Sequence, residues 1–377
     1  MDMDSKTMRT GAAEEPHYES SNGVQLLPQE IIMDILSRLP IHFLLQCTLV
    51  SKAWRNIIVR NPIFASMQHN QALENRHKSH GLMFCLENPS KSPNLYLVER
   101  GGAPHGKLTV MYAQLTCLEC WFDVIGSCNG LLCFSYYDNG VGGYCKSNRA
   151  CVSNPITGEC VILPSEDSKC AWISGFGFDS TRKEYKVVRV VRNRDAVLST
   201  AEIHTLGSNS WRRIEDDPHS RTKYMRSQSD VLVNGRLHWC SFPNKPIFIF
   251  SLDMGHEQFE EVPVVTGLGS RGFIYLVDWK GCLAIVEVEL MLKDDDALHI
   301  WVMKEYNVKE SWTRQANVRW RPTWLYGSTG YAPFYDEGVI HDLQVTDHPR
   351  FRGRNRYRVI AHVGSLISLK TLMGKEV

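Results

Sequence analysis

Two patterns of hydrophobic and polar positions divide the chain. Between residues 26 and 75, apolar residues recur every three or four positions, which is the spacing of one face of a helix. From about residue 80 onward, short runs rich in Val, Ile, Tyr and Phe alternate with Asn-Gly, Gly and Pro, and such runs predict strands. The pattern therefore predicts an α+β multidomain chain, with a small helical module followed by a large all-β region.

About three or four short helices are expected in the helical module. Pro28 stands at the favoured start of the first helix, and Pro40 ends it. Ser51 is a candidate N-cap for a later helix that carries Trp54. The module has more apolar side chains than it can enclose. The pattern is therefore compatible both with a bundle packed on the rest of the chain and with a docking surface for a partner.

An imperfect repeat runs through the β-rich region. Each unit holds about four expected strands in roughly 35 to 45 residues, and this period in an all-β chain is typical of propeller blades. The units span Asp123 to Pro164, Gly175 to Ile214, Asp230 to Pro263, and Phe273 to Trp312. Residues 80–112 and 325–369 are expected to supply the remaining strands and close the ring. The sequence favours a β-propeller, with a stacked β-sandwich as the alternative.

Charge and hydropathy narrow the possible functions. The 377 residues carry 42 basic and 41 acidic side chains, a formal net charge of +1, which gives no support to nucleic-acid or membrane-surface binding. No run of about 18 apolar residues predicts a transmembrane helix. Residues 1–23 are acidic and lack an apolar centre, so we expect a disordered leader rather than a signal peptide. These features favour the cytoplasm, the nucleus or both.

Two motifs resemble ligand sites. Cys117-x-x-Cys120, followed by Cys128 and Cys133, has spacings compatible with zinc, but the last two read more simply as small hydrophobic residues in strands. The segment Gly267–Gly272 has the letters of a dinucleotide-binding loop, which requires a following helix, whereas a strand is expected there. Hydrolase signatures are absent from the sequence. We therefore expect no catalytic residue, cofactor or metal, although residues distant in sequence can still assemble a site.

A strip of alternating arginines precedes the last expected strand. If residues 350–358 are extended, all five arginine side chains project from one face. Such a strip can bind an acidic or phosphorylated target, because the guanidinium pairs with carboxylate or phosphate through two hydrogen bonds. The alternative is a solvated edge whose charges prevent strand pairing. Arg352, Arg354 and Arg356 are the candidate target-binding residues.

The residues also resemble a known family. Leu27-Pro28-x-Glu30, Ile35 to Pro40, Leu44-Leu45 and Val50-Ser51-Lys52-x-Trp54 are similar in order and spacing to the F-box. Further motifs resemble the F-box-associated (FBA) domain of land-plant F-box proteins. These are Gly126 to Leu132, Asn154 to Glu159, Gly175 to Asp179, Tyr185 to Val188, Asn234 to Trp239 and Val363 to Leu369. The division implied is a leader at 1–23, an F-box at 24–75 and an FBA domain at 80–370.

The resemblance implies a function without catalysis. In this family the F-box binds the Skp-type adaptor of a cullin-RING (SCF) ubiquitin ligase, and the second domain holds the target protein. The residues implied for adaptor binding or for the module's own core are Leu27, Pro28, Ile31, Ile35, Leu39, Pro40, Leu44, Val50 and Trp54. Two alternatives remain: a scaffold that sends nothing for degradation, and a propeller enzyme with a docking helix.

Overall fold

The structure is a computed structural model that describes most of the helical module and the strands that follow it. For β1, β2 and β3 only the backbone is described. The described residues are 27–74, 81–88, 91–100, 108–113, 122–136, 149–165, 169–193, 199–214, 231–240, 247–268, 272–289, 296–320, 335–336, 339–340 and 356–374. The expected leader at 1–23, Cys117 and Cys120 therefore lie outside the described part of the chain.

Four helices form the N-terminal module, as the pattern predicted. They are α1 (Gln29–Ser37), α2 (Ile41–Cys47), α3 (Lys52–Arg60) and α4 (Pro62–Glu74). The Trp54 amide donates to Ser51 Oγ over 3.1 Å, which confirms the predicted N-cap of α3. Asn61 caps α4 in the same way, because its Oδ1 accepts from the amides of Ile63 and Phe64. Among the helices described, none is long and apolar enough to cross a membrane.

The described strands build five antiparallel four-stranded sheets and one small two-stranded sheet. The first sheet contains β22 (Arg356–His362), β1 (Gly81–Asn88), β2 (Lys91–Arg100) and β3 (Leu108–Ala113). The second contains β4 (Phe122–Cys128), β5 (Leu131–Tyr136), β6 (Arg149–Ser153) and β7 (Cys160–Ile162). The third contains β8 (Lys169–Asp179), β9 (Glu184–Asn193), β10 (Ser199–Thr205) and β11 (Arg212–Arg213).

Two further four-stranded sheets follow in sequence. The fourth contains β12 (Val231–Val233), β13 (Arg236–Cys240), β14 (Ile249–Asp253) and β15 (Phe259–Val262). The fifth contains β16 (Gly272–Trp279), β17 (Cys282–Glu289), β18 (Asp296–Met303) and β19 (Trp312–Trp320). The short strands β20 (Tyr335–Asp336) and β21 (Val339–Ile340) form the small sheet. A short helix, α5 (Leu369–Leu372), follows β22.

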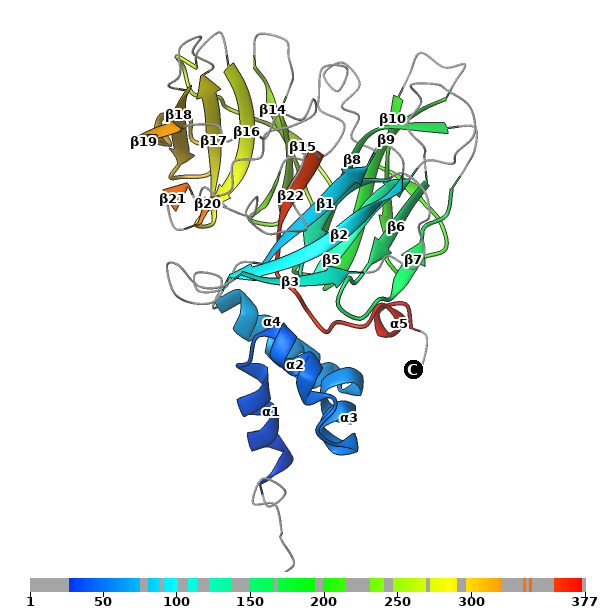
Figure 1. Cartoon of the computed structure of the whole chain (residues 1–377). Helices are drawn as coiled ribbons and strands as arrows, with labels where there is room; N and C mark the ends of the chain where they lie inside the picture. The colour runs from blue at the N-terminus through cyan, green and yellow to red at the C-terminus, as the bar shows by residue number, and fades with distance from the viewer. Residues whose placement is uncertain are drawn as a thin grey trace, which may run out of the picture.

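These sheets are the blades of a β-propeller (Figure 1). Each blade uses consecutive strands, except that the late strand β22 pairs with β1 from the start of the region, with His362 opposite Gly81. This pairing joins distant parts of the chain in one blade, as expected for residues 80–112 and 325–369. The other four blades match the four predicted repeat units. The prediction of a propeller is confirmed, and the sandwich alternative is set aside.

Tight hairpins explain why the repeat was visible in the sequence. Asn129-Gly130 joins β4 to β5, and Asn234-Gly235 joins β12 to β13. All four residues have positive φ, from 48° to 79°. This two-residue turn matches the twist of paired strands, and it favours Asn followed by Gly because both tolerate left-handed backbone. The strand β16 begins at Gly272, the last residue of the Gly267–Gly272 motif, which confirms that a strand and not a helix follows this motif.

Neighbouring blades are held together by apolar packing and by tryptophan side chains. Trp239 is buried between two blades, and its Nε1 donates to Ser174 O over 3.2 Å. Trp312 Nε1 likewise donates to Pro263 O over 2.8 Å, which ties the outer strand of one blade to the end of the preceding one. Cys128 and Cys133 are buried in another interblade cluster, which confirms that they act as small hydrophobic residues in strands.

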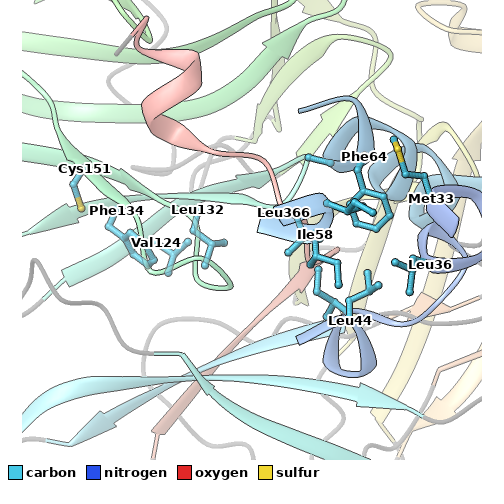
Figure 2. Packing of buried hydrophobic residues seen from close by; sticks show 13 residues of the cluster. Met33, Leu36, Leu44, Ile58, Phe64, Val124, Leu132, Phe134, Cys151 and Leu366 are labelled. Atoms are coloured by element: carbon cyan, nitrogen blue, oxygen red, sulfur yellow. The ribbon is translucent and has the colours of Figure 1, made fainter. Parts of the chain in front are cut away.

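The helical module packs directly against the propeller. One buried cluster combines side chains of all four helices with the blade β4–β7 and with a residue near the C-terminus, as Figure 2 shows. Its members are Met33, Leu36, Ile41, Leu44, Ile57, Ile58, Phe64, Ala65, Val124, Leu132, Phe134, Cys151 and Leu366. The helices therefore bury one face against each other and the propeller, and what remains exposed on them becomes informative.

Candidate functional site

Large apolar side chains are exposed mainly on the helical module. Among the described residues, eleven large hydrophobic side chains are exposed, and nine of them lie between residues 27 and 63. The described part of the propeller contributes only Ile162 and Val308. Scattered exposed hydrophobic residues are normal, but such a concentration on one small module makes it a candidate interaction surface. The nine are Leu27, Ile31, Ile35, Phe43, Leu45, Leu49, Val50, Val59 and Ile63.

Helix α1 separates its two apolar faces clearly. Met33 and Leu36 are buried in the shared cluster, whereas Ile31 and Ile35 are 46% and 50% exposed. At about 100° per residue, the two isoleucines lie one turn apart on the side opposite the buried pair. Leu27, just before the helix, is also exposed. The two isoleucines form an apolar ridge that none of the described residues covers.

The turn after α2 extends this apolar surface. Leu44 is completely buried, but its neighbours Phe43 and Leu45 are exposed. Leu49 and Val50, which follow α2, are 87% and 66% exposed. A run of adjacent apolar residues on a helix cannot all face one side, so burial of Leu44 forces Phe43 and Leu45 outward.

The structure divides the residues that the sequence predicted for adaptor binding. Leu39 and Trp54 are half-buried against the shared cluster, and Leu44 belongs to the core. The exposed members are Leu27, Pro28, Ile31, Ile35, Pro40 and Val50. The sequence-based set omitted Phe43, Leu45, Leu49, Val59 and Ile63, which are equally exposed. The signal was the unbroken apolar run from Phe43 to Leu45, which one buried face could not absorb.

The predicted arginine strip is described only in part. Arg352 and Arg354 lie outside the described residues, and Arg356 is the first residue of β22. The backbone of Arg356 pairs with Glu87 of β1, and that of Arg358 pairs with Cys85. The strip therefore leads into the strand that also contacts β4 of the next blade.

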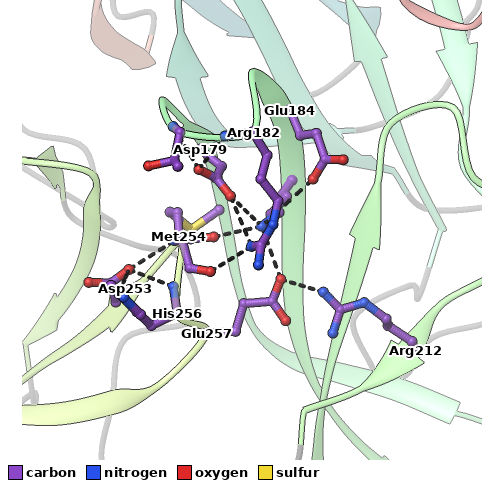
Figure 3. Close-up of polar contacts among 11 residues, drawn as sticks. Asp179, Arg182, Glu184, Arg212, Asp253, Met254, His256 and Glu257 are labelled. Atoms are coloured by element: carbon purple, nitrogen blue, oxygen red, sulfur yellow. Dashed lines mark hydrogen bonds and ion pairs between the residues drawn. The ribbon is translucent and has the colours of Figure 1, made fainter.

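A buried group of charged side chains between two blades is the strongest candidate for chemistry within the propeller (Figure 3). Lys186 Nζ donates to Asp179 Oδ2 over 2.8 Å, to Glu257 Oε1 over 3.0 Å and to Met254 O over 2.7 Å. The side chains of Lys186 and Asp179 are both 1% exposed. Arg212 also pairs with Glu257.

The electrostatics of this group indicate a structural role. Burial by itself raises the pKa of Asp179, but hydrogen bonds from Lys186 and from the Arg182 and Thr181 amides outweigh it and lower the pKa to about 2. The pKa of Glu257 is also lowered, because Arg212 and Lys186 outweigh its burial. A carboxylate so firmly ionised is a poor general base near neutral pH. The group is an ion-pair network that joins the β8–β9 hairpin to the β14–β15 hairpin.

Comparisons with known proteins agree with this architecture. A model of the F-box-like family matches residues 24–67, and a model of the F-box associated beta propeller domain matches residues 74–332. The Arabidopsis thaliana "F-box protein At3g07870" is 32% identical over 331 residues, which cover 78% of this chain and 73% of that protein. The Arabidopsis thaliana "F-box/kelch-repeat protein At3g23880" is 26% identical, over 79% of this chain and 82% of that protein.

Among solved structures, TolB from Acinetobacter baumannii is similar with a TM-score of 0.37 and 11% identity, over 65% of this chain and 57% of that one. The two domain matches occur in the same order as the helices and blades described above. The chain therefore belongs to the family of F-box proteins that carry an F-box associated beta propeller domain.

Proposed function

We propose that this protein is the substrate-recognition subunit of an SCF-type ubiquitin ligase. Its helices bind the Skp-type adaptor, and its propeller holds the target protein. The chain contributes no catalytic residue, and it raises the local concentration of target lysines near an enzyme held elsewhere in the complex. The observation that carries this proposal is the apolar surface on helices whose opposite face is already buried.

The exposed surface fits a stable partner. Full burial of a Leu or Ile side chain stabilises by about 1.5–3 kcal/mol relative to exposure. A partner that buries several of these exposed side chains would therefore bind the free chain strongly. Ile31, Ile35 and Val50 are the proposed centre of the adaptor surface, with Leu27, Pro28 and Pro40 beside them. Leu44 is buried in the shared cluster and Leu39 and Trp54 pack against it, so we assign these three residues to the support of the surface and not to direct contact.

We place target recognition at the end of the propeller remote from the helices. His362 pairs with Gly81, the residue at which the chain enters the propeller from α4, whereas Arg356 begins the same strand at its other end. Figure 1 shows β22 running toward the helices. At about 3.3 Å per residue, its two ends lie roughly 20 Å apart. Arg352, Arg354 and Arg356 therefore remain our candidates for binding an acidic or phosphorylated target.

The proposed domains have the boundaries expected from the sequence. We propose a leader at residues 1–23, an F-box at 24–75 and a propeller at 80–370. Because an SCF ligase acts on cytoplasmic and nuclear proteins, we place the chain in one or both of these compartments.

An adaptor-binding measurement tests the proposal. The double variant Ile31→Asp, Ile35→Asp places two charges on the exposed ridge of α1 without touching the buried Met33 and Leu36. We expect at least a hundredfold loss of affinity for a purified Skp-type adaptor, because buried apolar anchors at an interface contribute about 2 kcal/mol or more each.

The matched control is Ile162→Asp, which places the same charge on an exposed isoleucine of β7. It should leave adaptor affinity unchanged. Circular dichroism should show both variants folded. Unchanged binding by the α1 double variant would contradict the proposed surface, and no binding by the unaltered protein would contradict the proposed function.

A further inference from the structure

The residues after β22 lie between the helices and two blades. We name Val363–Leu372 the C-terminal strap. Leu366 packs in the cluster shared with all four helices. Leu369 is completely buried in a different cluster, formed by the blade β4–β7 and the strands β8 and β9. Figure 1 shows the strap passing from β22 beside α4 to α5 beneath the blade β4–β7. A single short segment thus packs both in the cluster shared with the helices and in the cluster between two blades.

Close packing surrounds the start of the strap. A Cβ atom at Gly364 would lie 3.4 Å from Ile41 Cγ2 of α2 and 3.5 Å from Ile156 in the turn between β6 and β7. The strap backbone therefore runs directly between a helix of the F-box and a turn of the propeller. Movement of the helices relative to this blade requires movement of the strap.

Asn154 holds the strap through its side chain. Its Nδ2 donates to Ser365 O over 3.0 Å and to Ile367 O over 2.8 Å. Its Oδ1 accepts from the Ile156 amide over 2.9 Å, which fixes the turn between β6 and β7. Asn154 is completely buried, so loss of the Nδ2 donor would leave two strap carbonyls without it in a dry site.

Two further contacts fasten the strap. Ser368 Oγ donates to Glu159 Oε1 over 3.0 Å, and the Leu369 amide donates to Glu159 Oε2 over 2.5 Å. Ser365 Oγ donates to Asn129 O over 3.2 Å, in the β4–β5 hairpin. The propeller thus grips the strap at two turns of one blade, and the strap in turn contacts the F-box.

We propose that the C-terminal strap fixes the direction in which the F-box helices project from the propeller. The proposal concerns the free chain, and only its consequence, a set distance between bound adaptor and bound target, rests on the proposed function. Orientation matters for such a receptor, because ubiquitin transfer requires the target lysine to reach an enzyme held on the adaptor side.

A matched pair of glycine variants tests this role. Gly130 and Gly235 occupy the same position of two equivalent hairpins, with φ of 79° and 72°. A Cβ at Gly130 would lie 2.2 Å from Ser365 Oγ and 2.8 Å from the Ser365 amide nitrogen, whereas at Gly235 it would meet nothing within 4 Å. Gly130→Ala and Gly235→Ala therefore introduce the same backbone strain, but only the first displaces the strap.

Two measurements on the full free chain report the result. Hydrogen exchange follows the amides of the strap, and spin labels on unnatural amino acids at the exposed Arg60 and Lys304 report the distance between F-box and propeller. We expect Gly130→Ala to raise strap exchange about tenfold and to broaden the distance distribution. Gly235→Ala should leave both measurements as in the unaltered protein.

Asn154→Asp provides a second test without backbone strain. It keeps the oxygen that accepts from the Ile156 amide but replaces the donor to the strap by an oxygen, so strap exchange should rise and distances should broaden. A loosened strap with an unchanged narrow distance distribution would overturn the proposal, as would an unaltered strap in both variants. Because neither readout involves the adaptor, failure of adaptor binding would leave this test intact.

Discussion

Lys186 allows the charge network between blades to be tested by a single substitution. Its ammonium group donates to both Asp179 and Glu257, and its side chain is 1% exposed. Lys186→Met keeps an unbranched side chain of similar length but removes the charge. The two carboxylates then face each other across the blade interface with less compensation, although Arg182 still pairs with Asp179 and Arg212 still pairs with Glu257.

The expected loss of stability in Lys186→Met is large. Breaking a buried ion pair by removing one partner destabilises a protein by about 3–5 kcal/mol, because the remaining charge is left buried. The effect must also depend on pH. In the unaltered protein the pKa of Asp179 is about 2, below its ordinary 3.8, so its contribution to stability is present above pH 3.8 and is lost as pH falls through 2.

Removal of Lys186 weakens this effect. The hydrogen bond and charge of Lys186 no longer lower the pKa of Asp179, which rises from about 2, while the Arg182 side chain and the Arg182 and Thr181 amides still lower it. The variant therefore loses less stability than the unaltered protein as pH falls from 3.8 toward 2. The stability difference between the two should be largest near pH 7 and should shrink toward pH 3. Urea unfolding followed by tryptophan fluorescence at both pH values measures this difference.

Lys183→Met is the matched control, because Lys183 is an exposed lysine on the same hairpin. It should change the unfolding midpoint little at either pH. The reasoning would be refuted if the free energy of unfolding of Lys186→Met lay within about 0.5 kcal/mol of that of the unaltered protein, because surface substitutions usually change it by no more than this. A difference that did not shrink on acidification would refute the role assigned to Asp179.

Two more predictions concern histidine and arginine. Burial lowers the pKa of His238 to about 4 from its ordinary 6.5, so stability should be complete above pH 6.5 and fall by about 3 kcal/mol as pH drops toward 4. His238→Gln should reduce this fall in the free energy of unfolding between pH 7 and 4, as measured by urea unfolding. An unchanged fall would mean that other groups cause it. Reversing Arg352, Arg354 and Arg356 to Glu should preserve adaptor binding and weaken capture of an acidic target, with a smaller dependence on salt. Unchanged capture by the triple variant would make the strip a solvated edge.

Local pattern was sufficient to predict most of the fold. The helices of residues 29–74 followed from apolar spacing and from Pro28, Pro40 and Ser51, because capping and proline geometry act within a few residues. The blades followed from repeated hairpins such as Asn129-Gly130, whose positive φ angles are required by the turn itself.

The candidate site was predicted less completely, since exposure is not a local property. Leu44 and Leu45 are neighbours of the same residue type, yet the first is completely buried and the second is exposed. Which of them faces outward depends on the other helices, on the blade β4–β7 and on Leu366, and these come from distant parts of the chain. The sequence could therefore identify the segment that forms the surface, but not which of its residues are exposed and which are buried.

The sequence by itself determined the helical module, the blade repeat and the family resemblance, because these depend on periodicity and on short-range turn chemistry. Only the tertiary structure decided that Asn154 and Glu159 hold the strap, which follows them by about two hundred residues. It likewise joined Lys186 to Glu257 across two blades. The physical reason is that ring closure and interblade packing bring together groups whose separation along the chain carries no signal in a single sequence.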